Sequence, residues 1–255
     1  MRIELAGLPG CGKSTLLRGL MAAPGGGGGA PQAGIESFAA RARRGRAIRM
    51  GGVRMLRRKP ERAELYALAR FAAENPAIFA ALQGGARDAP DRMVWTMLFM
   101  ANAWLAQAAP PRGPVVQDEG FVQYGMAALE AAPAEAVRRY ADVIPLPALT
   151  ILPVIGVEAV LARTARGDNR LPADLRGLEP VALERAFHAR AGVLEEICAV
   201  LGARGGAVLR LDATAPAQEV LRQAARAVRA LMTGAGPGPE AGAGTGALSP
   251  PSGTG

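Results

Sequence analysis

Histidine, cysteine, lysine and aromatic residues are all scarce in this chain of 255 residues. The two cysteines, Cys11 and Cys198, form neither a disulfide framework nor the spacing of a metal site, so we expect a reducing compartment. The one histidine, His188, lies beside Phe187 on the flank of an expected helix, which does not favour a catalytic role. Because aromatics make up 4% of the residues and alanine is abundant, we expect closely packed helices.

Long hydrophobic runs are also missing. The N-terminal stretch "MRIELAGLPG" lacks the long apolar segment of a signal peptide. An uncharged run at 93–109, "MVWTMLFMANAWLAQAA", contains Thr96, Asn102 and Gln107 and is shorter than the roughly 20 residues that cross a bilayer. We therefore expect a buried core helix there, no transmembrane segment, and a cytoplasmic protein.

The basic residues that are present are almost all arginines, since only Lys13 and Lys59 of the 30 are lysines. The formal net charge of +8 suggests a nucleotide, a nucleic acid or an acidic lipid as partner, although an arginine-rich soluble surface explains the charge alone. Arginines are densest at 41–62, where they could bind an anionic group of a substrate or a nucleic acid, or stay solvated. No aromatic residue is interleaved with them, so base stacking finds no support.

Apolar runs of strand length alternate with helical periodicity along the chain. Helices are expected at 13–21, 61–74, 77–83, 91–108, 157–166, 180–202 and 216–232, and in two pieces over 121–141. Strands are expected at about 3–6, 115–117, 149–155 and 207–211, with a fifth between 30 and 60, for which "AGIESFA" is the best candidate. This alternation predicts an α/β fold of three layers, with a mostly parallel five-stranded sheet between helices on both faces. We expect one domain over 1–232 and a disordered tail over 233–255.

The segment "GLPGCGKST" at 7–15 has the spacing of a phosphate-binding loop, G-x-x-x-x-G-K-[ST], between an expected strand and an expected helix. Glycines let several backbone N–H groups point at a phosphate chain, and the following helix adds the positive end of its dipole. Lys13 would reach the β- and γ-phosphates, Ser14 would bind Mg²⁺, and Thr15 would support from the next position. The expected nucleotide-binding residues are Gly7, Leu8, Pro9, Gly10, Cys11, Gly12, Lys13, Ser14 and Thr15.

Acidic residues follow the next expected strand, in "PVVQDEG" at 114–120. Asp118 is the expected second Mg²⁺ ligand, and Glu119 is placed to take a proton from an attacking hydroxyl or to orient a water. Arg163 and Arg166, three residues apart on one helix, and Arg170 could close over a γ-phosphate, although a solvated basic helix end explains them as well. The expected catalytic residues are Lys13, Asp118, Glu119, Arg163 and Arg166.

Four segments together resemble the P-loop kinases of the nucleoside and nucleoside-monophosphate kinase group: "IELAGLPGCGKSTLL", "VVQDEG", "ILPVIGVEAVLARTARG" and "AVLRLDATAPAQEVLRQA". The resemblance implies a strand order 2-3-1-4-5 and an ATP-dependent phosphotransferase with Mg²⁺. It also implies a lid at about 157–175 that carries Arg163 and Arg166, and an acceptor-side helical insert at about 35–110. The sequence departs from the group at "DEG", where thymidylate kinases have an aspartate–arginine pair and deoxynucleoside kinases a glutamate–arginine pair.

Three functions remain open from the sequence. The first, which we expect, is a kinase that moves the γ-phosphate of ATP to a small-molecule acceptor. The second is a regulatory or accessory NTPase that hydrolyses ATP or GTP, with Glu119 positioning the water. The third is a basic nucleotide-sensing protein that binds nucleic acid or a membrane surface. The sequence identifies neither the acceptor nor the oligomeric state.

Overall fold

The computed structural model describes residues 1–22, 36–37, 62–85, 96–98, 100–101, 104, 115–168, 171–172 and 174–234. Strands in this part of the chain are β1 (Arg2–Leu5), β2 (Glu36–Ser37), β3 (Val115–Gln117), β4 (Leu149–Val154) and β5 (Ala207–Asp212). Its helices are α1 (Lys13–Ala22), α3 (Arg62–Glu74), α4 (Pro76–Gly85), α6 (Phe121–Ala128), α7 (Ala134–Val143), α8 (Val157–Ala165), α9 (Pro180–Ala203) and α10 (Ala217–Met232). Apart from β2, these bounds lie within about two residues of those that the periodicity predicts.

Four of the strands form a parallel sheet in the order β3-β1-β4-β5. In the middle strand, Glu4 lies opposite Gln117 of β3 and Thr150 of β4. The predicted α/β class and parallel sheet are therefore confirmed on these four strands. The two-residue β2 pairs in parallel with β3 at the edge, within the "AGIESFA" segment. Because it is so short, the five-stranded sheet in the implied order stays a prediction.

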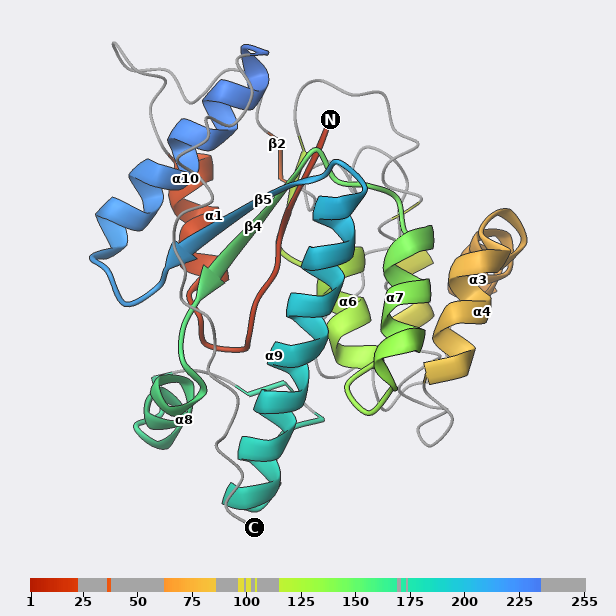
Figure 1. Ribbon diagram of the computed structural model, residues 1–255, viewed down its shortest axis with the longest axis horizontal. Coiled ribbons are helices and arrows are strands. Elements are labelled where there is room, and N and C mark those ends of the chain that lie inside the picture. The colour runs from red at the N-terminus through yellow and green to blue at the C-terminus, as the bar shows by residue number, and fades with distance from the viewer. Residues whose placement is uncertain are drawn as a thin grey trace.

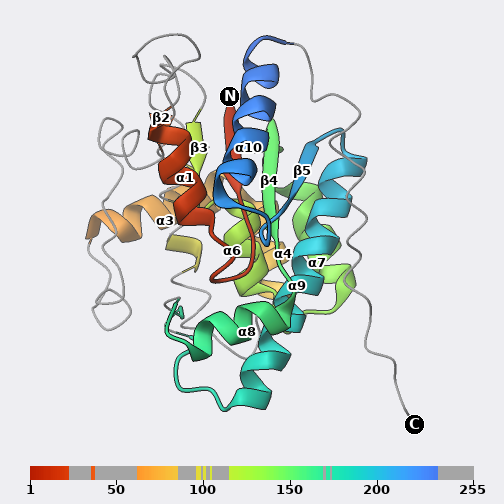
Figure 2. The ribbon, with the colours of Figure 1, turned by 90° about the vertical axis from the view of Figure 1, so that its left-hand side faces the viewer.

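Side chains of β1 point alternately to the two faces of the sheet, and each face is covered by a core. Ile3 and Leu5 pack against Leu16 and Leu20 of α1 and against the apolar face of α10. The larger core on the opposite face includes Phe121 and the apolar side chains of α7 and α9. Figures 1 and 2 show α1 and α10 together on one side of the sheet, with α6, α7 and α9 on the other. Helices thus cover both faces, as the strand–helix alternation predicts.

The connections that leave the carboxyl ends of the strands gather at one edge of the sheet. There β1 leads into α1, β3 bends into α6, β4 leads into α8, and β5 leads into α10. In Figure 1, α8 lies beyond the carboxyl end of β4. Ligands of open parallel sheets bind at this edge, so we expect the functional site here.

Parts of several predictions fall outside the described residues: the arginines of 41–58, Arg170, the tail from 235 and much of the insert. The described residues of the uncharged run at 93–109 are helical, and Met97, Leu98 and Met100 are buried, as expected of a core helix. In the ranges that the structure describes, no helix is both long enough and apolar enough to cross a bilayer.

Candidate functional site

The loop between β1 and α1 is the first part of the candidate site. Gly7 and Gly12 have φ angles of 151° and 98°, which glycine adopts without the strain that a side chain would cause. A Cβ atom at Gly7 would lie 2.8 Å from the Cys11 Sγ, so a side chain has no room there. Backbone bonds from the Cys11 N–H to the Leu8 carbonyl (3.2 Å) and from the Leu16 N–H to the Gly12 carbonyl (3.0 Å) close the loop. The segment therefore has the curled backbone that its spacing predicts.

The Lys13 ammonium lies against the inside of this loop. Its Nζ donates to the carbonyl oxygens of Gly7 (2.6 Å) and Leu8 (3.1 Å) and lies 3.7 Å from the Cys11 Sγ. These contacts hold a compact positive charge beside the first turn of α1. A planar guanidinium is larger and presents its donors in a rigid fork, so arginine would not reproduce both contacts.

Ser14 and Thr15 are exposed at the start of α1, where the backbone N–H groups of the first turn have no partner within the helix. A cavity of about 540 Å³ opens over this end. Its lining residues are Gly10, Gly12, Lys13, Ser14, Thr15, Arg163 and Asp168. An ammonium, a guanidinium and a helix N-terminus in one cavity favour a polyanionic ligand.

The bend after β3 carries the two predicted carboxylates. Since β3 pairs in parallel with β1, Asp118 and Glu119 leave the sheet beside the start of the loop. Glu119 accepts a hydrogen bond from the Tyr124 hydroxyl at 3.1 Å. The Glu119 side chain is exposed at the bend. Partial loss of hydration next to the protein and then the Asp118 charge raise the pKa of Glu119, against smaller opposing effects of Tyr124 and of the Lys13 charge. The Lys13 charge therefore acts on Glu119, which follows from the loop and the bend lying at the same edge of the sheet.

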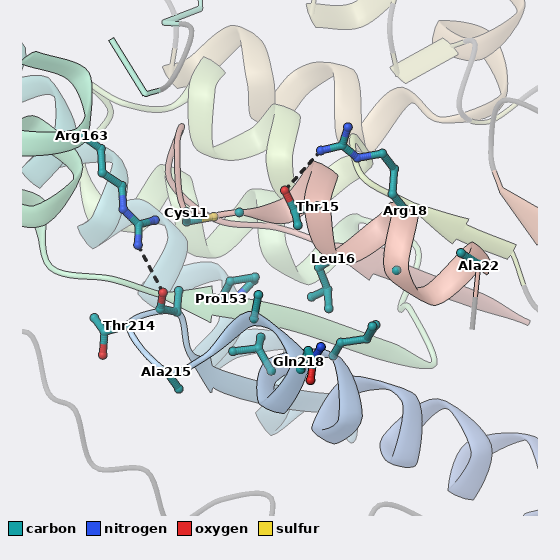
Figure 3. Close-up of a pocket in the computed structure, with 16 residues that line it drawn as sticks. Cys11, Thr15, Leu16, Arg18, Ala22, Pro153, Arg163, Thr214, Ala215 and Gln218 are labelled. Atoms are coloured by element: carbon teal, nitrogen blue, oxygen red, sulfur yellow. Dashed lines mark hydrogen bonds between the residues drawn. The ribbon is translucent and has the colours of Figure 1, made fainter. Parts of the chain in front are cut away.

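Arg163 joins the loop to the residue that follows β5. From α8, its guanidinium donates to the Gly10 carbonyl at 3.0 Å and to the Ala213 carbonyl at 3.4 Å, the second bond being drawn in Figure 3. Arg166 has a different partner, because its Nε donates to Asp168 at 2.8 Å and both side chains are exposed. The structure therefore brings Arg163 against the loop and directs Arg166 to an acidic neighbour.

A second cavity, of about 620 Å³, lies between α1 and α10 (Figure 3). It shares Gly12, Thr15 and Arg163 with the cavity over Ser14, so the two cavities adjoin. Most of the side chains that line it are apolar, and the polar ones include Arg18, which donates to the Thr15 Oγ1 at 3.3 Å. The apolar lining residues are Leu16, Ala22, Pro153, Ala213, Ala215, Ala217, Val220 and Leu221.

The wall of this cavity between β5 and α10 is held by a short polar turn. Asp212 Oδ1 accepts hydrogen bonds from the Thr214 N–H (2.8 Å) and the Thr214 hydroxyl (2.6 Å), and these bonds lower the pKa of Asp212. The turn presents the Ala213 carbonyl to Arg163. Asp212 therefore acts on the cavity indirectly, by fixing the backbone that lines it.

Three contributors to the site were missed by the sequence reasoning. Gln123 accepts the Gly7 N–H at 3.0 Å through its Oε1, and Tyr124 holds Glu119. A signal for both exists, since they are polar residues in the otherwise apolar α6, "FVQYGMAA", just after the carboxylates. The third is Ala213, which acts through a backbone carbonyl, so its residue type carries no signal.

No protein-family model matches this chain, and no curated protein matches its sequence. Among solved structures, deoxyadenosine kinase from M. mycoides with the products dCMP and a flexible dCDP bound is 13% identical, with a TM-score of 0.48, over 90% of this chain and 100% of that one. The same kinase with dCTP bound gives a TM-score of 0.47, and with dATP bound 0.44 at 11% identity, over the same shares of the chains. Likeness at this level carries no information about substrate, so function has to be argued from the site itself.

Proposed function

We propose that this protein is an ATP-dependent phosphotransferase that moves the γ-phosphate of ATP to a small-molecule acceptor. The pair of adjoining cavities at the carboxyl edge of the sheet carries the proposal. One cavity is lined by polar residues that include Lys13 and Ser14. The other has a mainly apolar lining and lies between α1 and α10. A nucleoside triphosphate has the same two parts, a polyanionic chain and a flat base, joined where Gly12, Thr15 and Arg163 line both cavities.

The phosphate chain would bind over the start of α1. Its β- and γ-oxygens would accept hydrogen bonds from the N–H groups of Gly12, Lys13 and Ser14 and from the Lys13 ammonium. The bonds that Lys13 makes to the Gly7 and Leu8 carbonyls keep its charge in place before the ligand arrives. Less reorganisation is then needed on binding, which favours affinity.

Mg²⁺ would enter with the nucleotide. The Ser14 hydroxyl and the Asp118 carboxylate are hard oxygen donors, and Mg²⁺ commonly takes one or two protein ligands together with substrate phosphates and waters. Within the described ranges, no group of three or more histidine, cysteine, aspartate or glutamate side chains forms a metal site by itself. The donors therefore fit an ion shared with phosphate oxygens, whose negative charge it would neutralise.

In the transfer step, the acceptor hydroxyl oxygen bonds to the γ-phosphorus while the bond from that phosphorus to the β–γ bridging oxygen breaks, leaving ADP. The hydroxyl proton goes to Glu119, whose raised pKa makes it a stronger base than an ordinary carboxylate. Lys13 and Arg163 stabilise the charge on the transferring group. Arg166 would join them only after its exposed bond to Asp168 opens.

Hydrolysis is the alternative, with a water in place of the acceptor hydroxyl and Glu119 as its base. Arg163 favours transfer, because two carbonyls hold this cation against the phosphate loop, where it can help to exclude water. A protein that only senses nucleotides, and binds nucleic acid or a membrane through its arginines, has no feature in its favour among the described residues.

The deciding experiment is ADP release from MgATP, with and without a panel of hydroxyl-bearing acceptors such as nucleosides, nucleoside monophosphates and sugars. We expect slow release alone and faster release with the right acceptor, both abolished by Lys13→Ala. Steady hydrolysis that no acceptor accelerates would favour the NTPase. Salt-dependent binding of nucleic acid that Lys13→Ala leaves unchanged would favour the sensor. If calorimetry with Mg²⁺ detects binding of neither ATP nor GTP, the proposal is rejected.

A further inference from the structure

Glu4 is a fully buried carboxyl in the middle strand of the sheet, three residues before the phosphate loop begins. Its neighbours across the sheet, Gln117 and Thr150, are polar and buried too. Among the described residues, Glu4 Oε2, both Gln117 amide atoms and Thr150 Oγ1 have no hydrogen-bond partner. Arg2 Nη2 lies 3.8 Å from Glu4 Oε2 in an ion pair whose two side chains are largely buried. At that distance the arginine makes no hydrogen bond to Oε2, so it compensates the burial of the carboxyl only in part.

The one hydrogen bond described for the Glu4 carboxyl goes to α6. Its Oε1 accepts the Val122 N–H at 2.8 Å, which satisfies one of the free donors of the first turn of that helix. Gly120 lies against the same carboxyl, since a Cβ atom there would come within 1.9 Å of Glu4 Oε1 and 2.3 Å of Cδ. The absence of a side chain at Gly120 therefore allows the bend after β3 to rest directly on Glu4.

The two residues after Val122 connect the same turn to the rest of the site. Gln123 accepts the Gly7 N–H at the start of the phosphate loop. Tyr124 donates to Glu119 in the bend. Three consecutive residues of α6 thus contact β1, the loop and the bend, and Glu4 is the contact that comes from the centre of the sheet.

We infer that Glu4 is a positioning residue, which fixes the first turn of α6 so that the Asp118–Glu119 bend and the phosphate loop stay aligned on one metal–nucleotide complex. This inference rests on the proposed function. Glu4 touches no substrate and acts on the site through its contacts with Val122 and Gly120. A displacement of about 1 Å at a catalytic group can cost about 100-fold in rate. The gain in rate from a fixed turn can therefore outweigh the loss of stability from a buried carboxyl.

The test compares ATP affinity by calorimetry with Mg²⁺ and with EDTA, in the wild type, Glu4→Ala and Glu4→Gln. The gain in affinity due to Mg²⁺ depends on the alignment of Asp118 with Ser14, whereas binding in EDTA depends on the loop. We expect Glu4→Ala to lose most of the Mg²⁺ gain, to keep the affinity in EDTA, and to lower turnover by about 10- to 100-fold. Glu4→Gln keeps an oxygen that can accept the Val122 N–H. It should therefore retain the Mg²⁺ gain and the turnover of the wild type.

Thr150→Val is the matched control, because Thr150 lies in the same buried row without a described bond to α6. It should leave the Mg²⁺ gain and the turnover unchanged. If Glu4→Ala fails to fold, Gly120→Ala replaces it, since its Cβ separates Glu4 from the bend while the carboxyl stays in the chain. The same loss of Mg²⁺ gain is expected.

Two results would overturn the inference: a Mg²⁺ gain that survives both Glu4→Ala and Gly120→Ala, or equal losses with Mg²⁺ and with EDTA, which would indicate a merely structural role. Failure of the proposed function looks different, because it is seen in the wild type. A wild type that transfers no phosphate but gains affinity from Mg²⁺ rejects the kinase and leaves the alignment testable. A wild type that gains nothing from Mg²⁺ rejects both.

Discussion

Arg163 and Gly10 are 153 positions apart in the chain, and the arginine NH1 donates to the glycine carbonyl at 3.0 Å. The bond ties α8, which follows β4, to the loop at 7–15, which follows β1. Because the same guanidinium also reaches the Ala213 carbonyl, it stands where both cavities meet. A cation in that position is held by backbone carbonyls of two separate segments.

We expect the replacement of Arg163 to affect catalysis more than nucleotide binding. In Arg163→Ala, the loop N–H groups and Lys13 still hold the phosphates, but the charge that develops on the transferring group loses a donor. We expect turnover to fall by about 100-fold or more, while the ATP dissociation constant rises by less than about tenfold. Steady-state kinetics and calorimetry measure the two effects.

The matched control for Arg163 is Arg166→Ala, from the same helix and of the same charge. Its guanidinium is exposed and paired with Asp168, so we expect a smaller loss of turnover. Equal losses in the two variants would mean that the contact with Gly10 does not distinguish the two arginines.

Lys13→Arg tests whether charge alone suffices in the loop. The variant keeps the positive charge, but a guanidinium cannot sit 2.6 Å from the Gly7 carbonyl and 3.1 Å from the Leu8 carbonyl as the ammonium does. We expect turnover to fall by about 100-fold or more, close to the loss in Lys13→Ala. An arginine variant with near-normal turnover would show that the compact ammonium is not required.

The elements of this fold could be predicted because each has a local cause. The leucines of α1 recur at helical spacing, α10 alternates a small apolar face with arginines, and short apolar runs end in glycine or carboxylates. The motif at 7–15 is local too, since its glycines, Lys13 and Ser14 all fall within nine residues. The match between the predicted and observed bounds reflects this agreement between local sequence and global packing.

The rest of the site could not be predicted because it depends on register and on backbone atoms. Glu4 and Gln117 interrupt apolar runs, but only the pairing of β1 with β3 reveals that they lie side by side. Val122 and Ala213 contribute an N–H and a carbonyl, which every residue has. The exposed bond of Arg166 to Asp168 depends on the shape of the chain after α8, which the spacing of two arginines does not determine.

Filling the second cavity tests which part of the nucleotide it holds. Ala215 lines this cavity, and Ala215→Trp would occupy the space between α1 and α10. We expect ATP affinity to fall by about tenfold or more, while the affinity for inorganic tripolyphosphate, which lacks a base, stays the same. The control is Gln223→Trp, because Gln223 is exposed on α10 and does not line the cavity. It should change neither the ATP affinity nor the tripolyphosphate affinity. Parallel losses for both ligands would place the base elsewhere.

Tyr124→Phe is expected to move the pH dependence of turnover. The tyrosine hydroxyl bond to Glu119 lowers the pKa of that carboxyl, so its removal leaves the partial loss of hydration and the Asp118 charge less opposed and raises the pKa further. A base must be deprotonated to work, so turnover rises with pH through that pKa, and the acidic limb of the profile should shift to higher pH. Glu119→Gln should remove the limb. A limb that is the same in Tyr124→Phe and the wild type would exclude Glu119 as the base.

Because the Glu4 carboxyl is buried, we expect the stability of the fold to depend on pH. Burial is the main cause that raises the pKa of Glu4, and the Arg2 charge and the Val122 N–H oppose it. The Glu4 charge also interacts electrostatically with Tyr124 on α6, Tyr140 on α7 and Cys198 on α9. Their pKa values are raised as well, to about 12 for Cys198, so they hold their protons at the pH where Glu4 titrates.

The native protein therefore holds the Glu4 proton more tightly than the unfolded chain does. The stability that this adds is complete below the unfolded pKa of about 4.5 and is lost as pH rises through the higher pKa of the folded state. Glu4→Gln has no proton to lose. We expect the free energy of unfolding of the wild type, relative to Glu4→Gln, to fall as pH rises from about 4.5 and then to level off. Urea unfolding at a series of pH values measures the difference, and a difference that does not change with pH would mean that the buried carboxyl has an ordinary pKa.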